Sequence, residues 1–390
     1  MPMKIPPDNK QKNFIQKAIQ QETVLCAAFV LAAVSSLIIP PDSAYRSYID
    51  WNTLLLLFAL MAVMAGFQKL GIFKAVGKKL LSRTRNTRQL FMVLVFLPFF
   101  FSMLITNDVA LITFVPFAVI VLRLSRQEKQ IVPLVILQTL AANLGSMLTP
   151  MGNPQNLYLY AKSGISLPAF LQLMLPYSIA SGLCLLTAIL LMKKESLDAL
   201  DLTAGSFSDV SGQQENAIPR LICFGIGFLL CLLCVAKLLA PAAAAVILLV
   251  YLFFTDRALL KKIDYSLLGT FVCFFIFIGN MGRIERFCAL LERLLTGHER
   301  IVAVLSSQII SNVPAALLLS GFTDKYTSLI VGTNLGGLGT LIASMASLIS
   351  YKQIAREYPA QKGTYFGMFT LANIIMLAVL LPLSVFLSKS

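Results

Sequence analysis

The sequence predicts an all-α polytopic membrane protein made of two inverted repeats, each with a re-entrant helical hairpin and a broken transmembrane helix. Three observations lead to this fold class. The chain of 390 residues is 57% hydrophobic and only 13% charged, which is about half the charge of a soluble domain. Apolar runs of transmembrane length recur along it. Polar or helix-breaking residues interrupt some of these runs, at matching places in the two halves.

The expected crossings share an apolar stretch that approaches the roughly 20 residues a bilayer requires. They are 23–40, 52–70, 131–162 (interrupted), 169–192, 219–238, 240–255, 265–284, 327–350 (interrupted) and 364–388. Two further apolar segments, 89–122 and 299–322, have polar centres and are expected to enter and leave on the same side. Irregular backbone at membrane depth is tolerated only inside protein or beside a watery cavity. The expected total is therefore about nine crossings and two hairpins.

These segments divide the chain into five parts. Residues 1–22 are a cytoplasmic N-terminal segment, 23–192 the first repeat, 193–218 a cytoplasmic linker, 219–238 a connecting span and 239–390 the second, inverted repeat. Most of the 32 Lys and Arg residues fall in loops on the side of the N-terminus. The positive-inside rule then places the N-terminus in the cytoplasm and the C-terminus outside, in the inner (plasma) membrane. The net charge of +14 is thus a topology signal, and nucleic acid is not an expected partner.

Three short patterns recur in the same order in the two halves. Ile49-Asp50-Trp51 is echoed by Ile263-Asp264-Tyr265, and Thr106-Asn107-Asp108-Val109 by Ser311-Asn312-Val313-Pro314. Asn143-Leu144-Gly145-Ser146 is matched by Asn334-Leu335-Gly336-Gly337. Four crossings and a hairpin make each half, and the odd span 219–238 between them inverts the second copy. Inverted-topology repeats are common among secondary transporters, whose binding sites lie at broken helices.

The interrupted segments carry the candidate site. Two prolines and a glycine break the helix within Thr149–Asn156, and glycines do so within Gly332–Thr340, which frees backbone groups. Half-helix N-termini favour anions, and unwound carbonyls favour cations. Helix packing is the alternative role for Gly336, Gly337 and Gly339. The candidate substrate- and ion-binding residues are Thr106, Asn107, Asp108, Thr149, Gly152, Asn153, Pro154, Asn156, Ser311, Asn312, Thr333, Asn334, Gly337 and Thr340, with Na⁺ expected at Asn107, Asp108, Ser311 and Asn312.

Asp108 is the most informative single residue. It lies in an apolar hairpin with no Lys or Arg nearby in the sequence, and an acid within a membrane is a functional candidate by default. It is expected to carry a proton or hold a cation. The alternative is that Asp108 only caps the second half-helix. Because the second half has Val313 at the matching position, only one coupling site of this kind is expected.

Thr106-Asn107-Asp108-Val109-Ala110-Leu111-Ile112 with Pro116, the Gly145–Asn156 stretch and Ser311-Asn312-Val313-Pro314 resemble the ion transporter superfamily. It includes citrate and divalent-anion symporters, arsenite permeases and one class of sodium/proton antiporters, and the resemblance covers about residues 23–388. In the dicarboxylate symporters a Ser-Asn-Thr at each hairpin tip contacts carboxylate and sodium. Here Asp108 and Val313 replace the third position, which moves the chain toward the arsenite-permease type. The resemblance implies a scaffold that dimerises and a transport domain that moves like an elevator.

The predicted function is a secondary active transporter that moves a small anion, carboxylate or oxyanion across the inner membrane, coupled to Na⁺ or H⁺, by alternating access at the hairpin tips. A sodium/proton antiporter that uses Asp108 is the alternative. No cofactor is expected beyond Na⁺ as a coupling ion, and the expected partners are the anion, Na⁺ or H⁺, the bilayer and a second copy of the chain. An enzyme is not expected, because the single His298 lies in a polar stretch, away from the intramembrane acid.

Overall fold

A computed structural model describes residues 22–82, 84–196 and 217–387. Most of the expected N-terminal segment and of the linker 193–218 therefore lies outside the described residues. The described chain is helical almost throughout, and its one β-type contact is an isolated bridge between Asn86 and Ser196. The all-α class is confirmed.

The first half forms a series of apolar helices with short connections. They are α2 (Thr23–Ile38), α3 (Tyr45–Tyr48), α4 (Trp51–Lys69), α5 (Ile72–Leu81), α6 (Thr87–Phe101), α7 (Asn107–Leu124), α8 (Ile131–Gly145), α9 (Pro154–Ser163) and α10 (Leu167–Leu191). Local residues define where several of them start. Asp50 caps α4 by accepting the Thr53 N–H at 3.1 Å, and Asn86 caps α6 in the same way through Gln89.

The connecting span and the second half also form a series of apolar helices. Its helices are α11 (Ala217–Val235), α12 (Pro241–Thr255), α13 (Arg257–Leu260), α14 (Tyr265–Met281), α15 (Glu285–Leu295), α16 (Glu299–Ile310), α17 (Asn312–Leu319), α18 (Tyr326–Gly336), α19 (Met345–Glu357) and α20 (Lys362–Leu387). Asp264 caps α14 by accepting the Leu267 N–H at 2.9 Å, as Asp50 caps α4. The matching Ile-Asp patterns of the sequence therefore begin two equivalent helices.

The backbone breaks where the sequence predicted interruptions. Residues 102–106 separate α6 from α7, while Ser311 alone separates α16 from α17 and has the unusual φ of +73°. Two 3-10 turns, Ser146–Leu148 and Pro150–Gly152, lie between α8 and α9. Residues 337–344 separate α18 from α19, so the break predicted within Gly332–Thr340 begins later than expected, and Gly332–Gly336 continue the helix. A break therefore lies at or directly beside Asn107, Pro150, Asn312 and Gly337.

Length and hydropathy identify six described helices able to cross a membrane: Trp51–Lys69, Asn107–Leu124, Glu128–Leu148, Leu167–Leu191, Ile218–Val235 and Pro359–Leu387. A seventh is counted if Tyr265–Met281 and Glu285–Leu295, bent by 105°, form one span. Three apolar helices are shorter: Val24–Ile38, Thr87–Phe101 and Pro241–Thr255. Among the six candidate spans, α7 differs from expectation, because the sequence predicted it only as half of a re-entrant hairpin. The figure of nine crossings stays a prediction.

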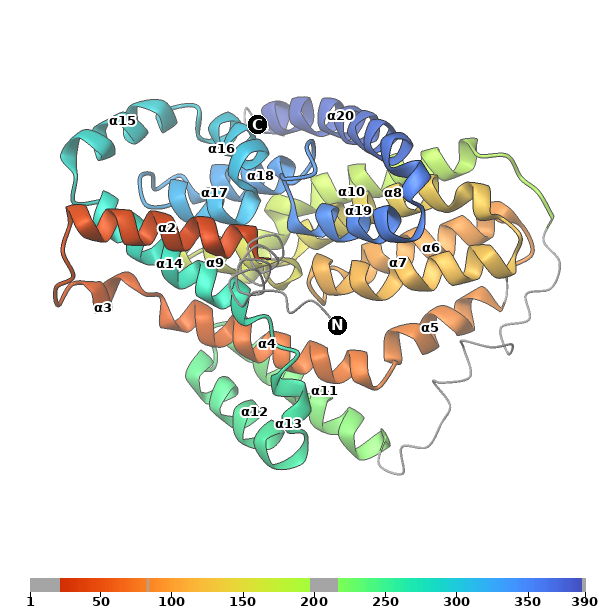
Figure 1. Ribbon diagram of the computed structural model, residues 1–390, viewed down its shortest axis with the longest axis horizontal. Helices are drawn as coiled ribbons and strands as arrows, with labels where there is room; N and C mark the ends of the chain where they lie inside the picture. Colours follow the sequence, from red (N-terminus) through yellow and green to blue (C-terminus); the bar gives the residue numbers. More distant parts are fainter. Residues whose placement is uncertain (1–21, 83, 197–216, 388–390) are drawn as a thin grey trace, which may run out of the picture.

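Helices of one half pack against those of the other in a reciprocal way. The helix α2 of the first half lies along α14 of the second, and α12 of the second half lies along α4 of the first (Figure 1). Among the interrupted elements, α9 packs against α17 and α18, and α19 packs against α7 and α8. The two halves therefore share one interior and do not form separate domains.

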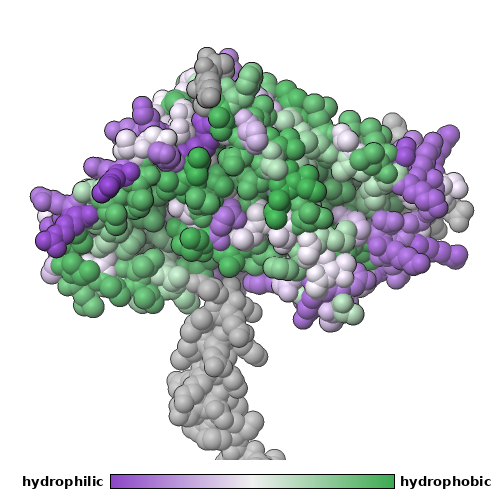
Figure 2. All heavy atoms as spheres, turned by 90° about the horizontal axis from the view of Figure 1, so that it is seen from above, coloured by the Kyte–Doolittle hydropathy of each residue, from purple (hydrophilic) through white to green (hydrophobic). Residues whose placement is uncertain are grey.

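The outer surface is apolar over a wide area. In the view of Figure 2, hydrophobic residues cover the middle of the molecule and hydrophilic residues gather toward its two ends. Large side chains on the outermost helices are exposed, such as Leu37 on α2 (84%) and Phe254 on α12 (78%). Such a surface is suited to lipid and would be unfavourable in water.

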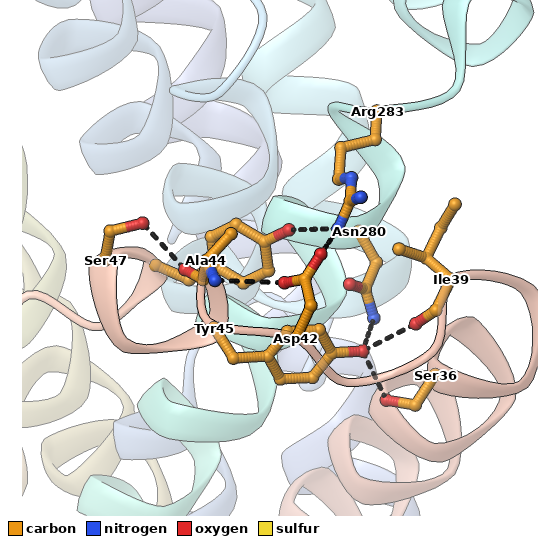
Figure 3. Close-up of polar contacts among 9 residues, drawn as sticks. Ser36, Ile39, Asp42, Ala44, Tyr45, Ser47, Asn280 and Arg283 are labelled. Atoms are coloured by element: carbon orange, nitrogen blue, oxygen red, sulfur yellow. Dashed lines mark hydrogen bonds and ion pairs between the residues drawn. The ribbon is translucent and has the colours of Figure 1, made fainter.

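A polar cluster ties the loop after α2 to the end of α14 (Figure 3). Asn280, buried in α14, donates through Nδ2 to Ser35 Oγ at 3.1 Å and to Tyr45 OH at 2.8 Å. Nearby, Arg283 donates to the Asp42 carboxylate at 2.7 Å. The hydrogen bond from Arg283 holds the pKa of Asp42 below its ordinary value. The loop is thus fixed by one buried and one exposed set of contacts.

Candidate functional site

The break between α8 and α9 depends on glycines that allow backbone to approach backbone. A Cβ at Gly152 would lie 2.1 Å from Ser146 O and 2.8 Å from Ser102 O. A Cβ at Gly145 would lie 2.0 Å from Phe99 O. These contacts hold the break against the turn between α6 and α7, and only glycine leaves room for them. The Thr149 hydroxyl donates to the Met103 carbonyl in the same turn.

Side-chain amides connect the interrupted helices. Asn107, at the first hairpin tip, donates through Nδ2 to Asn143 Oδ1 at 3.0 Å. Ser146 Oγ donates to Asn143 O at 2.9 Å and accepts from Asn153 Nδ2 at 3.2 Å. Asn153 Nδ2 also lies 3.2 Å from Asn334 Oδ1, in the second half. We call this set the amide network: Asn107, Asn143, Ser146, Asn153, Asn156, Asn334, Ser344 and Ser347.

Within the amide network, Asn334 of the second half and Asn143 of the first half make matching hydrogen bonds to the opposite half. Asn334 accepts from Asn153 at 3.2 Å and donates to Asn156 Oδ1. Its equivalent, Asn143, accepts from Ser344 at 3.0 Å and donates to Ser347 Oγ at 3.2 Å. Asn143 and Asn334 lie in the last turns of α8 and α18, and Asn153 and Ser344 directly precede α9 and α19. The reciprocal bonds are those expected of two halves related by a pseudo-twofold axis.

Two cavities meet at Asp108. The central cavity has a volume of about 150 Å³ and includes the candidate residues Thr106, Asp108, Asn153 and Pro154 in its lining. The lateral cavity, of about 170 Å³, lies between α2, α14 and α19 and is also lined by Asp108. Both cavities share Asp264. Lys262 lines the central cavity and Lys352 the lateral one.

Asp108 occupies the first turn of α7 and does not cap it. The cap position belongs to Thr106, whose side chain makes no capping bond. The Asp108 N–H donates to Asn107 Oδ1 at 3.0 Å, while Asp108 Oδ1 is buried and has no hydrogen-bond partner among the described residues. The capping role considered for Asp108 is therefore wrong. A buried acceptor without a partner, at a cavity wall, is available to a ligand.

The second hairpin tip is closed by backbone contacts. Asn312 N donates to Ala343 O at 3.0 Å, and Ser311 Oγ lies 3.4 Å from the same oxygen. A Cβ at Gly337 would lie 3.0 Å from Asn312 Nδ2. Ala343 precedes Ser344 of the amide network, so both tips converge on the start of α19. Neither Ser311 nor Asn312 lines a cavity that contains Asp108.

Two candidates lie outside this centre. The Thr333 hydroxyl donates to Leu329 O at 2.8 Å within its own helix. Thr340 bonds to Gln308 of α16 through its N–H at 2.9 Å and its hydroxyl at 3.1 Å. Both contacts hold the α18–α19 segment in place without facing the cavities.

Sequence reasoning missed three residues of the site. Asn143 and Asp264 stood in the repeated patterns but were read only as markers of the repeat, and Gln68, which lines the central cavity, carried no signal. Their positions follow from packing between distant segments. A polar residue repeated at the start or end of equivalent helices was the available sign.

A third cavity lies farther along α4, at its N-terminal end. This vestibule has a volume of about 360 Å³ and is lined by Asn52 and Thr53 of α4, by Tyr160 and by Lys237 of the α11–α12 loop. Leu157 of α9 lines both the vestibule and the central cavity. This side chain therefore contributes to the walls of both spaces.

Comparisons with known proteins agree with this architecture. The model of the citrate transporter family matches residues 18–325. An uncharacterized transporter of Methanocaldococcus jannaschii is 32% identical over 305 residues, covering 78% of this chain and 81% of the relative. Inner membrane protein YbiR of Escherichia coli is 30% identical over 318 residues, covering 79% and 81%. The silicon efflux transporter LSI3 of Oryza sativa subsp. japonica is 34% identical over 186 residues, covering 47% and 37%.

Proposed function

Since the chain belongs to the citrate transporter family, a family of multi-pass membrane transporters and not of enzymes, we propose that it is a secondary active transporter of a small anion or oxyanion in the inner membrane. One observation carries the proposal. The central cavity is lined at the interrupted helices by the first turn of α7 and by Asp108, whose buried Oδ1 has no hydrogen-bond partner among the described residues. Free helix N-termini and an unpaired acid at membrane depth together suit an anion and its coupling cation.

The lining of the central cavity supports a compact, oxygen-rich substrate. Asn153 and Gln68 supply amide groups, Thr106 a hydroxyl, and Lys262 a positive charge. A volume of about 150 Å³ is below the range typical of pockets for drug-sized ligands, and we therefore favour a compact oxyanion or hydroxylated inorganic acid over citrate. One relative is named a silicon efflux transporter. The departure from Ser-Asn-Thr at Asp108 points the same way, and small carboxylates stay within the proposal.

Coupling is assigned to Asp108, with Na⁺ or H⁺ as the coupling ion. A carboxylate in a cavity can bind Na⁺ or H⁺, and it must release the bound cation before it can bind the next one. The hairpin tips, with Asn107, Ser311 and Asn312 near the same helix start, would alternately expose this site to the two sides. Leu157 lines both the vestibule and the central cavity, and it is proposed as part of the barrier that allows access from one side at a time.

The orientation proposed is a cytoplasmic N-terminus and an outer C-terminus. The central and lateral cavities are flanked by Lys262 and Lys352, which lie in segments that the positive-inside rule places in the cytoplasm. In this conformation Asp108 would therefore face the cytoplasm. A homodimer remains part of the proposal on the resemblance alone.

The test is flux through purified protein in liposomes. Arsenite, sulfate, succinate and citrate serve as separate probes, each with an imposed Na⁺ or pH gradient and a matched vesicle without a gradient. We expect accumulation of one probe above equilibrium, driven by one gradient and abolished in Asp108→Asn. The control is Asp50→Asn, which keeps a helix cap and lies outside the cavities. Equal flux with and without gradients would indicate a channel and contradict the proposal.

The sodium/proton antiporter is the second candidate, because Asp108 has no counterpart in the other half. Vesicles with an acidic interior and no transportable anion distinguish the two. Collapse of the pH gradient on addition of Na⁺ supports the antiporter. A gradient that collapses only when an oxyanion has been loaded inside the vesicles, so that it leaves together with protons, supports a proton-coupled symporter.

A further inference from the structure

On the basis of the transport function above, we propose that Asp264 is the second carboxylate of the coupling-ion site, so that one monovalent cation is shared between Asp108 and Asp264. Asp108 comes from the first half and Asp264 from the second. Both line the central cavity and both line the lateral cavity. The site therefore lies at the junction of the two spaces, where α7 faces the start of α14.

The two carboxylates differ in access and in bonding. Asp264 is exposed and uses Oδ1 to cap α14, accepting the Leu267 N–H at 2.9 Å, whereas Oδ2 is not used by that bond. Asp108 Oδ1 is buried and has no partner among the described residues. A buried carboxylate without a partner is costly unless a cation or proton accompanies it. An exposed acid that lines the same two cavities would provide a path by which that cation enters from solvent.

The other charged groups around the two cavities do not neutralise Asp108 or Asp264. Glu22, before α2, accepts from the Ser266 hydroxyl, so one of its oxygens is occupied. Lys262 and Lys352 line opposite cavities and are exposed. The helices α6 and α8, which pack against α7, contribute no charged side chain to either cavity. No described basic side chain forms an ion pair with Asp108 or Asp264 within 4.0 Å.

The pseudo-symmetry supplies a matched control. Asp50 caps α4 as Asp264 caps α14. Each carboxylate accepts a hydrogen bond from the backbone N–H three residues later, at 3.1 Å for Asp50 and 2.9 Å for Asp264. Asp50 lines neither cavity that contains Asp108. If Asp264 only caps its helix, Asp50→Asn and Asp264→Asn should behave alike. Asparagine caps as well as aspartate, so both variants should fold.

Cation binding is measured on the purified full-length chain by thermal unfolding in detergent. NaCl is titrated against choline chloride at constant ionic strength and fixed pH, for the wild type and for Asp108→Asn, Asp264→Asn, Asp264→Glu and Asp50→Asn. We expect the half-maximal Na⁺ concentration to rise about tenfold or more in Asp108→Asn and Asp264→Asn, to recover partly in Asp264→Glu, and to stay within about twofold of the wild type in Asp50→Asn.

A second arm identifies a site that takes only protons. Unfolding temperature is then followed from pH 5 to pH 8 in choline chloride. The wild type and Asp50→Asn should show a pH-dependent change that both Asp108→Asn and Asp264→Asn lose. The proposal is overturned if Asp264→Asn matches the wild type in both arms, or if Asp50→Asn changes as much as Asp264→Asn. Binding is measured without flux, so failed transport and failed sharing of the cation are separate results.

Discussion

Gly152→Ala is expected to be among the most damaging single-methyl additions in the chain. The new Cβ would begin 2.1 Å from Ser146 O and 2.8 Å from Ser102 O. Real Cβ contacts stay at 3.0 Å or more, so two segments of backbone must separate. Neither can rotate away as a flexible side chain would. Overpacking of this kind costs about 1–3 kcal/mol, and we expect the upper part of that range.

The consequence should also reach the cavity. Asn153 follows Gly152 directly and lines the central cavity, so a displaced break moves a candidate substrate ligand. We therefore expect Gly152→Ala to lower the stability by about 2–3 kcal/mol and to reduce transport beyond what the loss of folded protein explains. Unfolding followed by circular dichroism in detergent gives the first quantity. Flux per folded molecule in liposomes gives the second.

Gly225→Ala is the matched control. Gly225 lies within α11, and a Cβ there would meet nothing within 4 Å. Alanine in a helix interior is favoured over glycine by about 0.5–1 kcal/mol, so this variant should be as stable as the wild type or slightly more so. If Gly152→Ala unfolds like Gly225→Ala, the close backbone contact at the break is not part of the native structure.

Three further outcomes are expected. Asn143→Ala removes three side-chain hydrogen bonds and should lower stability by about 2 kcal/mol at the roughly 0.6 kcal/mol typical of each such bond in membranes, as measured by unfolding in detergent. Leu157→Ala should join the vestibule to the central cavity and produce a measurable leak of the coupling ion in liposomes without substrate. Finally, Arg283 lowers the pKa of Asp42, so their contact should stabilise the protein above the ordinary pKa of an aspartate and cease to do so as pH falls through the lowered value.

Each outcome has a control that separates the stated cause from general damage. Ser347→Ala removes only one bond to Asn143, and a loss as large as that of Asn143→Ala would contradict the additive estimate. Leu157→Met keeps volume and should stay tight. For the ion pair, the unfolding temperature of Asp42→Asn should depend less on pH between about 5 and 3 than that of the wild type; identical pH profiles would refute the linkage.

The sequence predicted the breaks in the helices better than the site they form. Pro150 and Pro154 disrupt the interior of a helix and Gly152 weakens it, while polar residues inside apolar runs marked the hairpins, so these positions followed from local chemistry. Local chemistry could not decide whether Asp108 caps a helix or lines a cavity, because both roles use the same residue type at the same place. Contacts across the halves, such as Asn153 with Asn334, require the relative placement of helices far apart in the sequence.

The same limit explains which candidates proved peripheral. Thr333 and Thr340 share a glycine-rich stretch with Asn334, yet their bonds stay within α18 or reach α16. An α-helix has 3.6 residues per turn, so side chains adjacent in sequence point in different directions. Asp264 was visible only as a repeated mark at a helix start. The orientation of that helix start toward α7 is what gives it chemical interest.

The exchange of partners between the halves has a consequence for biosynthesis. Because α2 packs along α14 and not along a helix of its own half, this early helix lacks its main packing partner until more than half of the protein has been made. At about 5–20 residues per second, translation from Ile38 to Tyr265 takes roughly 10–50 s. During that interval the membrane-insertion machinery or lipid must shelter the unmatched face of α2. A fragment that stops before α14 should therefore remain a substrate for quality-control proteases.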